Sequence, residues 1–331
     1  MRWGLIGAST IAEQHMIGAI RATGGVVAAV VSTTEARARD FASQTDIPAF
    51  GAILDLVLQD PSITAVYISS TNEKHHAQAL AAISSGKHVL CEKPLAMTVE
   101  AAVDMVRAAK AAGVVFATNH HLRCSGSHRA IRDLIRAGRI GRVLSLRLFH
   151  AVHLPANLQG WRVNDAGAGG GVIPDITVHD ADVARFLLDE TPVSVVAQMG
   201  ASGMGQGVED SAMSVWTMPS GAMVLSHESF THPFAGSGLE VHGTEGSIVA
   251  RGVMTQLPVG EIDLLTASGR DAVPYSPHNL YIQGVCDFLA AIAGQGAPAA
   301  TGEDGVASLA VALAVREAAR TGQRQLVKVP A

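Results

Sequence analysis

Apolar and polar positions follow two different patterns along the chain. In the first 120 residues, short continuous apolar runs alternate with amphipathic segments of helical spacing. The apolar runs cover residues 3–6, 26–31, 65–69, 88–91 and 114–117, and the amphipathic segments cover residues 11–21, 35–44, 52–58, 73–84 and 99–112. Continuous apolar runs are typical of buried parallel strands, and their alternation with helices predicts a parallel sheet with helices on both faces.

After residue 120 strands follow one another without intervening helices. This pattern, with turn residues between the strands, predicts a mostly antiparallel open sheet. The predicted elements are, in order, a helix at 127–137, a strand at 143–152, a Pro- and Gly-bearing loop at 153–171, a helix at 175–188, strands from 192 to 265 (among them 212–218 and 222–229), and closing helices at 280–293 and 305–321.

The two patterns predict two domains. Residues 1–120 are expected to form a doubly wound α/β domain of the Rossmann type, which binds a dinucleotide. Residues 121–331 are expected to form an α+β substrate-binding domain, with the closing helices able to pack back on the first domain.

The first strand leads into a loop of the kind that binds dinucleotide phosphates. The pattern for such loops is G-x-G-x-x-G/A. Gly7 holds the first place and Ala12 the third, but Ser9 stands where the second glycine is expected. Because Ser9 and Thr10 lie at a helix N-terminus, their hydroxyls can donate to phosphate oxygens. We therefore expect a working phosphate loop, in which hydrogen bonds from these hydroxyls partly replace the close approach of the backbone to the pyrophosphate that a second glycine would allow.

The second strand lacks the terminal acid that usually contacts a ribose 2′-hydroxyl. Ser32 and Thr33 follow it, and Arg37 and Arg39 come one turn later. Two hydroxyls and a guanidinium suit a 2′-phosphate, which favours NADP(H) over NAD(H). The alternative is that both arginines are ordinary solvated helix residues.

Three motifs together resemble one family. They are TNEKHH at 71–76, CEKPL at 91–95, and GGGVIPDITVHDAD at 169–182. The chain resembles the glucose–fructose oxidoreductase/inositol dehydrogenase (Gfo/Idh/MocA) family over essentially its whole length. E-K-P followed by D-x-x-x-H at this distance is far more specific than the glycine-bearing loop alone. The chain departs from the expected pattern at His15, Cys124, His153 and Pro174.

Three residues carry the expected chemistry. Reducing a ketone requires a hydride for carbon and a proton for the developing alkoxide. Asp175 and His179 are four residues apart and should share a helix face, and imidazole suits proton donation near neutral pH. Lys93, at a strand end, can place an ammonium against the carbonyl oxygen. We expect His179 as general acid, Lys93 as polariser and Asp175 as partner of substrate hydroxyls, although His179 and Lys93 could exchange the donor role.

The motifs and the family resemblance also imply a set of cofactor contacts. Within it, Asn72, His75 and Asn119 belong to the nicotinamide region, and Trp161 and Arg162 reach the cofactor from the second domain. The complete set is Gly7, Ala8, Ser9, Thr10, Ile11, Ala12, Ser32, Thr33, Arg37, Ser70, Thr71, Asn72, His75, Glu92, Lys93, Asn119, Trp161, Arg162 and Tyr281.

The expected function is the NADPH-dependent reduction of a neutral cyclic keto-sugar. The alternatives are a dehydrogenase of inositol or another sugar, a glycosidase that uses retained NAD, and a nucleotide-sensing regulator without turnover. No metal is expected, because the pairs His75-His76 and His120-His121 are adjacent and no H-E-x-x-H or cysteine cluster accompanies them.

Composition narrows the expected partners. A net charge of −5 over 331 residues gives no reason to expect nucleic acid or a membrane surface. The apolar runs are short, no signal peptide is visible, and three scattered cysteines suit a reducing, cytoplasmic location. The expected partner is a small sugar, and the chain is expected to be a monomer or a small homo-oligomer formed through the sheet of the second domain.

Overall fold

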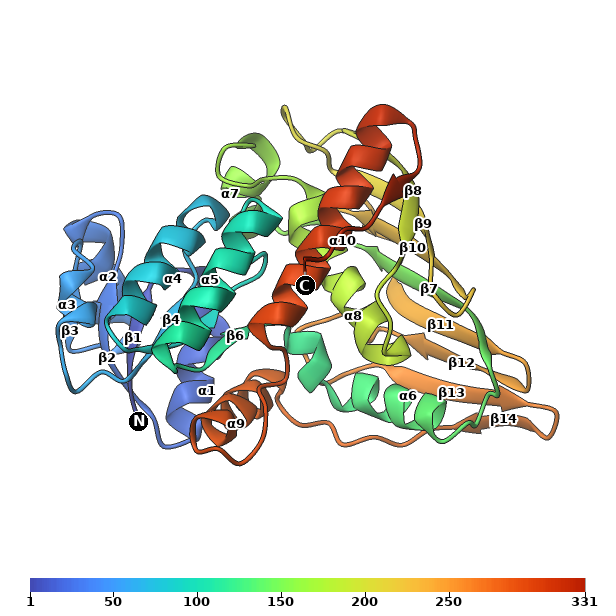
Figure 1. The fold of residues 1–331 in the computed structure, drawn as a ribbon, viewed down its shortest axis with the longest axis horizontal. Helices are drawn as coiled ribbons and strands as arrows, with labels where there is room; N and C mark the ends of the chain where they lie inside the picture. The colour runs from blue at the N-terminus through green and yellow to red at the C-terminus, as the bar shows by residue number, and fades with distance from the viewer. Residues whose placement is uncertain (331) are drawn as a thin grey trace. The chain divides into compact units, whose positions relative to one another are not determined.

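The computed structural model describes residues 1–330, which divide into two compact units (Figure 1). The first unit contains Met1–His120 and Tyr281–Val306. The second unit contains His121–Leu280 and residues 307–330. Each unit is built around its own sheet.

The first unit contains a six-stranded parallel sheet in the order β3-β2-β1-β4-β5-β6. Chain order reverses between β1 and β4, so the carboxyl ends of these strands meet where such sheets bind ligands. The strands are β1 Arg2–Ile6, β2 Val26–Val31, β3 Ala49–Gly51, β4 Ala65–Ile68, β5 His88–Cys91 and β6 Phe116–Thr118.

Helices of the first unit pack against this sheet, and α4 and α5 lie in front of it in Figure 1. Their beginnings follow local capping chemistry: the Thr34 and Thr98 hydroxyls accept the N–H of Arg37 and Ala101. The helices are α1 Ile17–Ala22, which continues a π-helical turn at Ala12–Met16, α2 Glu35–Thr45, α3 Asp55–Leu58, α4 His75–Ser84, α5 Val99–Ala112 and α9 Leu280–Ile292.

The second unit contains a nine-stranded sheet in the order β14-β13-β12-β11-β7-β10-β9-β8-β15. Within the described chain, β7 and β10 pair in parallel and the other neighbours are antiparallel. The strands are β7 Val143–Ala151, β8 Ser194–Gly200, β9 Ser211–Thr217, β10 Met223–Ser229, β11 Ser237–Gly243, β12 Gly246–Arg251, β13 Glu261–Thr266, β14 Gly269–Ala272 and β15 Gln325–Leu326.

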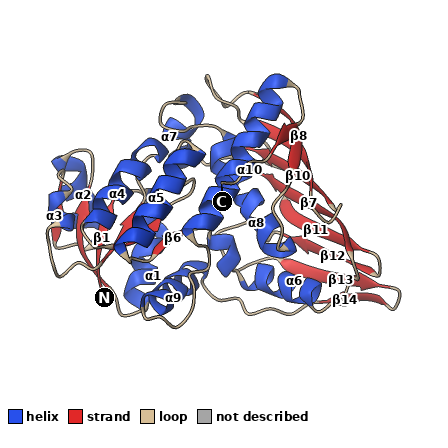
Figure 2. Cartoon of the chain, in the orientation of Figure 1, coloured by secondary structure: helices blue, strands red, loops and turns tan. Residues whose placement is uncertain are grey.

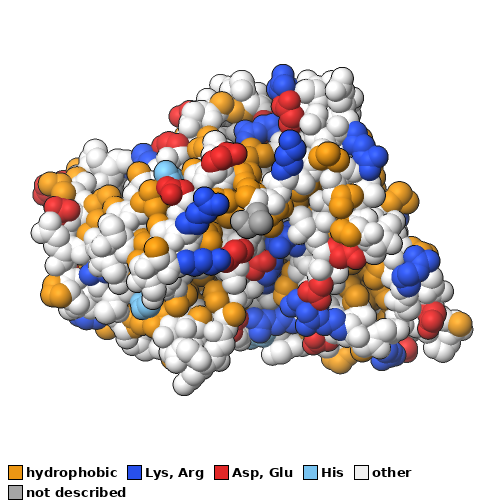
Figure 3. Space-filling view, viewed as in Figure 1, with side chains coloured by type: hydrophobic (Ala, Val, Ile, Leu, Met, Phe, Trp, Pro, Cys, Tyr) orange, Lys and Arg blue, Asp and Glu red, His pale blue; other side chains and the backbone are white. Residues whose placement is uncertain are grey.

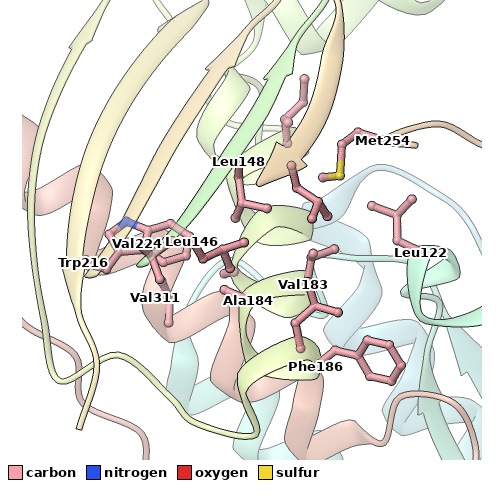
Figure 4. Close-up of a cluster of buried hydrophobic side chains, with 14 of the residues drawn as sticks. Leu122, Leu146, Leu148, Val183, Ala184, Phe186, Trp216, Val224, Met254 and Val311 are labelled. Atoms are coloured by element: carbon pink, nitrogen blue, oxygen red, sulfur yellow. The ribbon is translucent and has the colours of Figure 1, made fainter. Parts of the chain in front are cut away.

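The large sheet has one covered face and one open face. Helices α6 Gly126–Arg136 and α8 Val178–Leu188 lie against the covered face (Figure 2). Leu146, Val224 and Trp216 point into the core there, beside Val183 and Ala184 of α8 (Figure 4). Apolar side chains at alternating positions of the other face, including Val196, Met213, Val215, Met223 and Leu225, are exposed. The remaining helices of the chain are α7 Ala156–Asn164 and α10 Gly302–Thr321.

The expected fold class is confirmed, and the differences are local. The stretch 153–171, expected to be a loop, contains α7. Pro155 precedes this helix and Gly160 interrupts it with a positive φ of 34°, so its residue types look like those of a loop. The helix expected at 52–58 is reduced to Asp55–Leu58, and the edge strand β3 was not predicted.

Charges of both signs are interspersed on the face drawn in Figure 3. Among residues 1–330, no helix combines the length and the apolar character needed to cross a membrane. No group of three or more His, Cys, Asp or Glu side chains in that range could hold a metal ion.

Candidate active site

The glycine-bearing loop closely approaches the end of β4. Gly7 has a φ of +119°, and a Cβ there would lie 2.7 Å from the backbone of Ser69 and Ser70. The Ser9 hydroxyl donates to Ser69 Oγ at 2.7 Å and accepts the Ala12 N–H at 3.2 Å. The hydroxyl of Ser9 therefore secures the loop and the following turn.

The structure separates the two arginines that follow β2. Arg37 donates through Nη2 to the Ala8 carbonyl at 2.9 Å, so its guanidinium lies against the glycine-bearing loop. Arg39 pairs with Glu35 at 3.0 Å and lies 5.6 Å from the centre of the Phe50 ring. Arg37 is thus directed toward the loop, whereas Arg39 has the surface contacts of an ordinary helix residue.

His75 connects the TNEKHH and CEKPL segments. Its Nδ1 lies 2.8 Å from the Pro94 carbonyl oxygen and its Nε2 lies 3.1 Å from the Ser70 carbonyl oxygen. The side chain is fully buried, and this burial lowers the pKa of His75 despite the two carbonyls. Asn72 is buried nearby on the same segment. His75 therefore lies behind the two loops and ties them together.

Glu92 is the centre of a second hydrogen-bond cluster. Its Oε1 accepts from the Tyr67 hydroxyl at 2.5 Å and from Asn119 Nδ2 at 2.6 Å, while its Oε2 accepts the Lys93 N–H at 3.3 Å. Burial, followed by the charge of Glu92, raises the pKa of Tyr67 well above its usual range. The cluster fixes the backbone from which half-buried Lys93 extends. The Glu of E-K-P thus positions the Lys.

Tyr281 belongs to the first unit and packs on its first helical segment. Its ring stacks on His15, with centroids 4.6 Å apart and planes 14° apart. The helix that contains Tyr281, α9, also packs on β1, because Phe288 contacts Trp3 with ring centroids 5.4 Å apart. His15, one of the departures from the expected motif pattern, is thus the stacking partner of a predicted cofactor residue.

Three consecutive glycines allow the α7 segment to fold back on the start of the next helix. A Cβ at Gly170 would lie 2.6 Å from the Trp161 carbonyl oxygen, and one at Gly171 would lie 2.4 Å from Glu209 Oε1. The Gly171 N–H donates to the Arg162 carbonyl at 2.8 Å. Glu209 accepts the N–H of Ile173 at 3.2 Å, where a π-helical turn, Ile173–Thr177, begins.

Asp175 lies in that π-helical turn, whereas the sequence predicted a regular helix. Arg162 Nε lies 3.4 Å from Asp175 Oδ1, and the same guanidinium lies 4.7 Å from the centre of the Trp161 ring. The loop and the turn therefore bring together three residues of the predicted site. A π-helical turn in place of a regular one is frequent at functional sites.

His179, on α8, is surrounded by polar groups that the sequence did not single out. Its ring lies 4.9 Å from that of His121 and 6.4 Å from that of His150. His150 Nδ1 contacts Asp180 Oδ1 at 2.9 Å. One turn further along α8, Asp182 binds Arg123 through two contacts of 2.7 Å.

Asp180 and Asp182 belong to the same motif as His179, but His121, Arg123 and His150 come from distant parts of the sequence, so no local motif connects these three to His179. One signal was available: polar side chains occupy the inner face of otherwise apolar strands. On β7, Leu146 and Leu148 are followed by His150, and on β10, Val224 is followed by Ser226 and Glu228. Period-2 analysis of the strands could have marked these positions.

The predicted residues thus fall into two sets, one in each unit. Lys93 and the nucleotide loop belong to the first unit, and Asp175, His179, Trp161 and Arg162 belong to the second. The first set fits a nicotinamide dinucleotide, since the glycine-bearing loop follows the carboxyl end of β1, at the point where the strand order reverses.

Comparisons with known proteins cover both units. Residues 1–120 match the model of the oxidoreductase family with an NAD-binding Rossmann fold, and residues 128–249 match the GFO/IDH/MocA C-terminal domain. The chain is 55% identical over 323 residues to the 1,5-anhydro-D-fructose reductase of Ensifer adhaerens, covering 97% of each chain.

Solved structures with the same fold include two sugar oxidoreductases. The aldose-aldose oxidoreductase of Caulobacter crescentus, complexed with glycerol, is 25% identical with a TM-score of 0.90, covering 98% of this chain and 99% of that one. A levoglucosan dehydrogenase in complex with NADH and L-sorbose is 25% identical with a TM-score of 0.88, covering 99% of both chains.

The contact between Gly171 and Glu209 can be tested by Gly171→Ala. We expect this variant to lower the free energy of unfolding by about 2–5 kcal/mol, from backbone strain together with the clash against Glu209. Gly138→Ala is the matched control, because Gly138 also has a positive φ, of 69°, but nothing lies within 4 Å of the added Cβ. Urea unfolding measures both variants, and equal losses would contradict the packing role of Gly171.

Proposed function

The chain belongs to the Gfo/Idh/MocA family of oxidoreductases, and from this premise we propose that it reduces 1,5-anhydro-D-fructose to 1,5-anhydro-D-mannitol with NADPH. The observation that carries the proposal is the 55% identity to a 1,5-anhydro-D-fructose reductase across 97% of both chains. The site supports it with groups suited to a neutral sugar: a carboxylate and imidazoles in the second unit, and an ammonium in the first.

The choice of NADPH rests on Arg37 and on the absence of an acid after β2. An acidic side chain there would repel a 2′-phosphate, whereas Ser32 and Thr33 supply hydroxyls. Arg37 is held against the phosphate loop by its contact with the Ala8 carbonyl. A guanidinium so placed would pair with the 2′-phosphate while Gly7 and the following turn receive the pyrophosphate.

The proposed chemistry divides between the two sets of residues. Bound NADPH would supply the hydride that reduces the keto carbon. Lys93, fixed by Glu92, directs its ammonium to the carbonyl oxygen and stabilises developing negative charge. His179 donates the proton that completes the alcohol, and Asp175, oriented by Arg162, accepts hydrogen bonds from sugar hydroxyls.

We extend the proposal to the two units as functional domains, with the nucleotide on the first and the sugar mainly on the second. The nicotinamide region would be shaped by His75, Asn72 and Asn119, which hold the loops around it. Tyr281 would lie at its edge, where its ring stacks on His15. A reducing, cytoplasmic environment is part of the proposal, and the three cysteines, all of them free thiols, suit it.

The activity is tested by following NADPH absorbance with a panel of cyclic keto-sugars and inositols. We expect 1,5-anhydro-D-fructose to give the highest kcat/KM in the panel. An inositol or a simple aldose oxidised faster with NAD⁺ or NADP⁺ would replace the proposed substrate with that of another family member.

Arg37→Ala tests the cofactor preference. Removing a charge-assisted contact should cost on the order of 1.5–3 kcal/mol of NADPH binding and change NADH binding little. Arg39→Ala, which loses the surface contacts with Glu35 and the Phe50 ring, is the control and should leave both affinities near wild type. Fluorescence titration with each cofactor makes the measurement, and equal losses of both would show that Arg37 acts on the loop alone.

His179→Ala and Asp175→Ala separate proton transfer from sugar binding. General acid catalysis is worth about 10²–10⁴-fold, so His179→Ala should lose about that much kcat. Asp175→Ala should instead raise KM for the sugar with a smaller effect on kcat. Steady-state kinetics beside an NADPH titration measures both variants, and we expect NADPH to bind each of them. A near-normal kcat for His179→Ala would transfer the donor role to Lys93 or to water.

A further inference from the structure

A chain of buried polar side chains extends from His150 into the core, behind the residues used in the proposed reaction. His150 Nδ1 contacts Asp180 Oδ1 at 2.9 Å. The Ser226 hydroxyl lies 3.2 Å from Asp180 Oδ2 and makes a very short hydrogen bond with Glu228 Oε1. Asp180, Ser226 and Glu228 expose none of their surface.

The strand register brings these groups together. On the neighbouring parallel strands β7 and β10, Leu146 pairs with Val224, Leu148 with Ser226 and His150 with Glu228. The inner face is therefore apolar at one end and polar at the other, beside α8. Apolar side chains would pack as well at the polar end and avoid the cost of burying acids.

The contacts of Ser226 favour one protonated acid. The Ser226 hydroxyl has a single proton, so it can donate to either Asp180 or Glu228 but not to both. Both contacts are hydrogen bonds when the other carboxyl group is protonated and donates to the Ser226 oxygen. Asp180 has an imidazole partner in His150, whereas Glu228 faces the charge of Asp180. Burial and that charge raise the pKa of Glu228 well above its usual range, which assigns the proton to Glu228.

We propose that Asp180 and Glu228 are positioning residues for the reduction, with protonated Glu228 holding Asp180 through Ser226 and ionised Asp180 holding His150 beside His179. This inference rests on the function proposed above. Asp180 accepts the Nδ1 proton of His150, so a further proton taken up from solvent is carried on Nε2. The ring centroids of His150 and His179 lie 6.4 Å apart, too far for a direct hydrogen bond between the imidazoles. After His179 gives its proton to the alkoxide, Nε2 of His150 therefore returns one to His179 through a water and regains it from solvent.

The surroundings of His150 allow a clean test. The titratable groups that face it are Asp180 and His179 on α8, Glu228 on β10 and His128 on α6. Burial lowers the pKa of His128 to about 4, so His128 is neutral at working pH. Glu228 is neutral as well in this account. Asp180→Asn therefore removes the carboxylate charge in contact with His150 and keeps the shape of the side chain.

We expect Asp180→Asn to lower kcat for the keto-sugar on the order of 10- to 100-fold, the range typical of groups that orient a functional histidine. The alkaline limb of its kcat–pH profile should move to lower pH, because the imidazolium loses its counter-charge. The NADPH affinity should not change. Asp263→Asn is the control, since Asp263 lies on β13 of the same sheet and pairs with Arg251 and Arg270 at the surface. It should leave the profile in place.

Glu228 is tested by a rescue. Glu228→Ala should reduce kcat, and Glu228→Gln should recover most of the loss, because the amide can donate to Ser226 as the protonated acid does. An active wild-type enzyme whose Asp180→Asn variant keeps the wild-type profile would overturn the inference. So would a Glu228→Gln variant as impaired as Glu228→Ala. An inactive wild-type enzyme would overturn the proposed substrate instead.

The pH dependence of protein stability tests the protonation state of Glu228 without an activity measurement. If Glu228 is protonated when folded and ionised when unfolded, the wild-type protein loses stability as pH rises above the unfolded glutamate pKa of about 4.3. Glu228→Gln lacks this loss, so the difference in midpoint temperature between variant and wild type should shift in favour of the variant as pH rises from 5 to 8. A difference that stays constant, or that shifts in favour of the wild type, would contradict a protonated Glu228.

Discussion

Two buried carboxylates on helix α8 constrain how the second unit is assembled. Asp180 and Asp182 have almost no exposed surface, and a buried carboxylate is tolerated only where a partner compensates for lost hydration. Asp182 binds the Arg123 guanidinium through two contacts of 2.7 Å, and Asp180 contacts His150 on β7. Each pair attaches α8 to a different element, so the helix that carries His179 is fixed both to the sheet and to the segment at His121–Cys124.

In the first unit, the main constraint is the close packing of backbone segments at the carboxyl ends of the parallel strands. Gly7 permits the contact of the first loop with Ser69 and Ser70, and His75 and Glu92 hold the following two loops by hydrogen bonds to carbonyl, hydroxyl and amide groups. Most of these groups do no chemistry themselves. They fix the backbone from which Lys93 extends and hold the loops that follow β4 and β5 against each other.

The hydrophobic pattern predicted the architecture because buried parallel strands and half-buried antiparallel strands have different periodicities. The pattern did not predict α7, because Pro155 precedes this helix and Gly160 interrupts it, and both residue types are typical of loops. Motifs predicted Lys93, Asp175 and His179, and with them Glu92 and Arg162, but not the more distant groups around them. Glu209, His150 and Glu228 lie far away in sequence and become neighbours of the site only through strand pairing and the folding back of a glycine-rich loop.

If a keto-sugar accepts the hydride in this site, the hydrogen transferred from NADPH must appear on the carbon of its keto group, and isotope transfer can follow it. The purified protein would be given 1,5-anhydro-D-fructose and NADPH carrying deuterium at the transferable position of nicotinamide C4, and the product analysed by NMR. The account predicts one deuterium at C2 of the sugar, in the configuration of 1,5-anhydro-D-mannitol. Deuterium that remains entirely in the nucleotide, or a product labelled at another carbon, would contradict it.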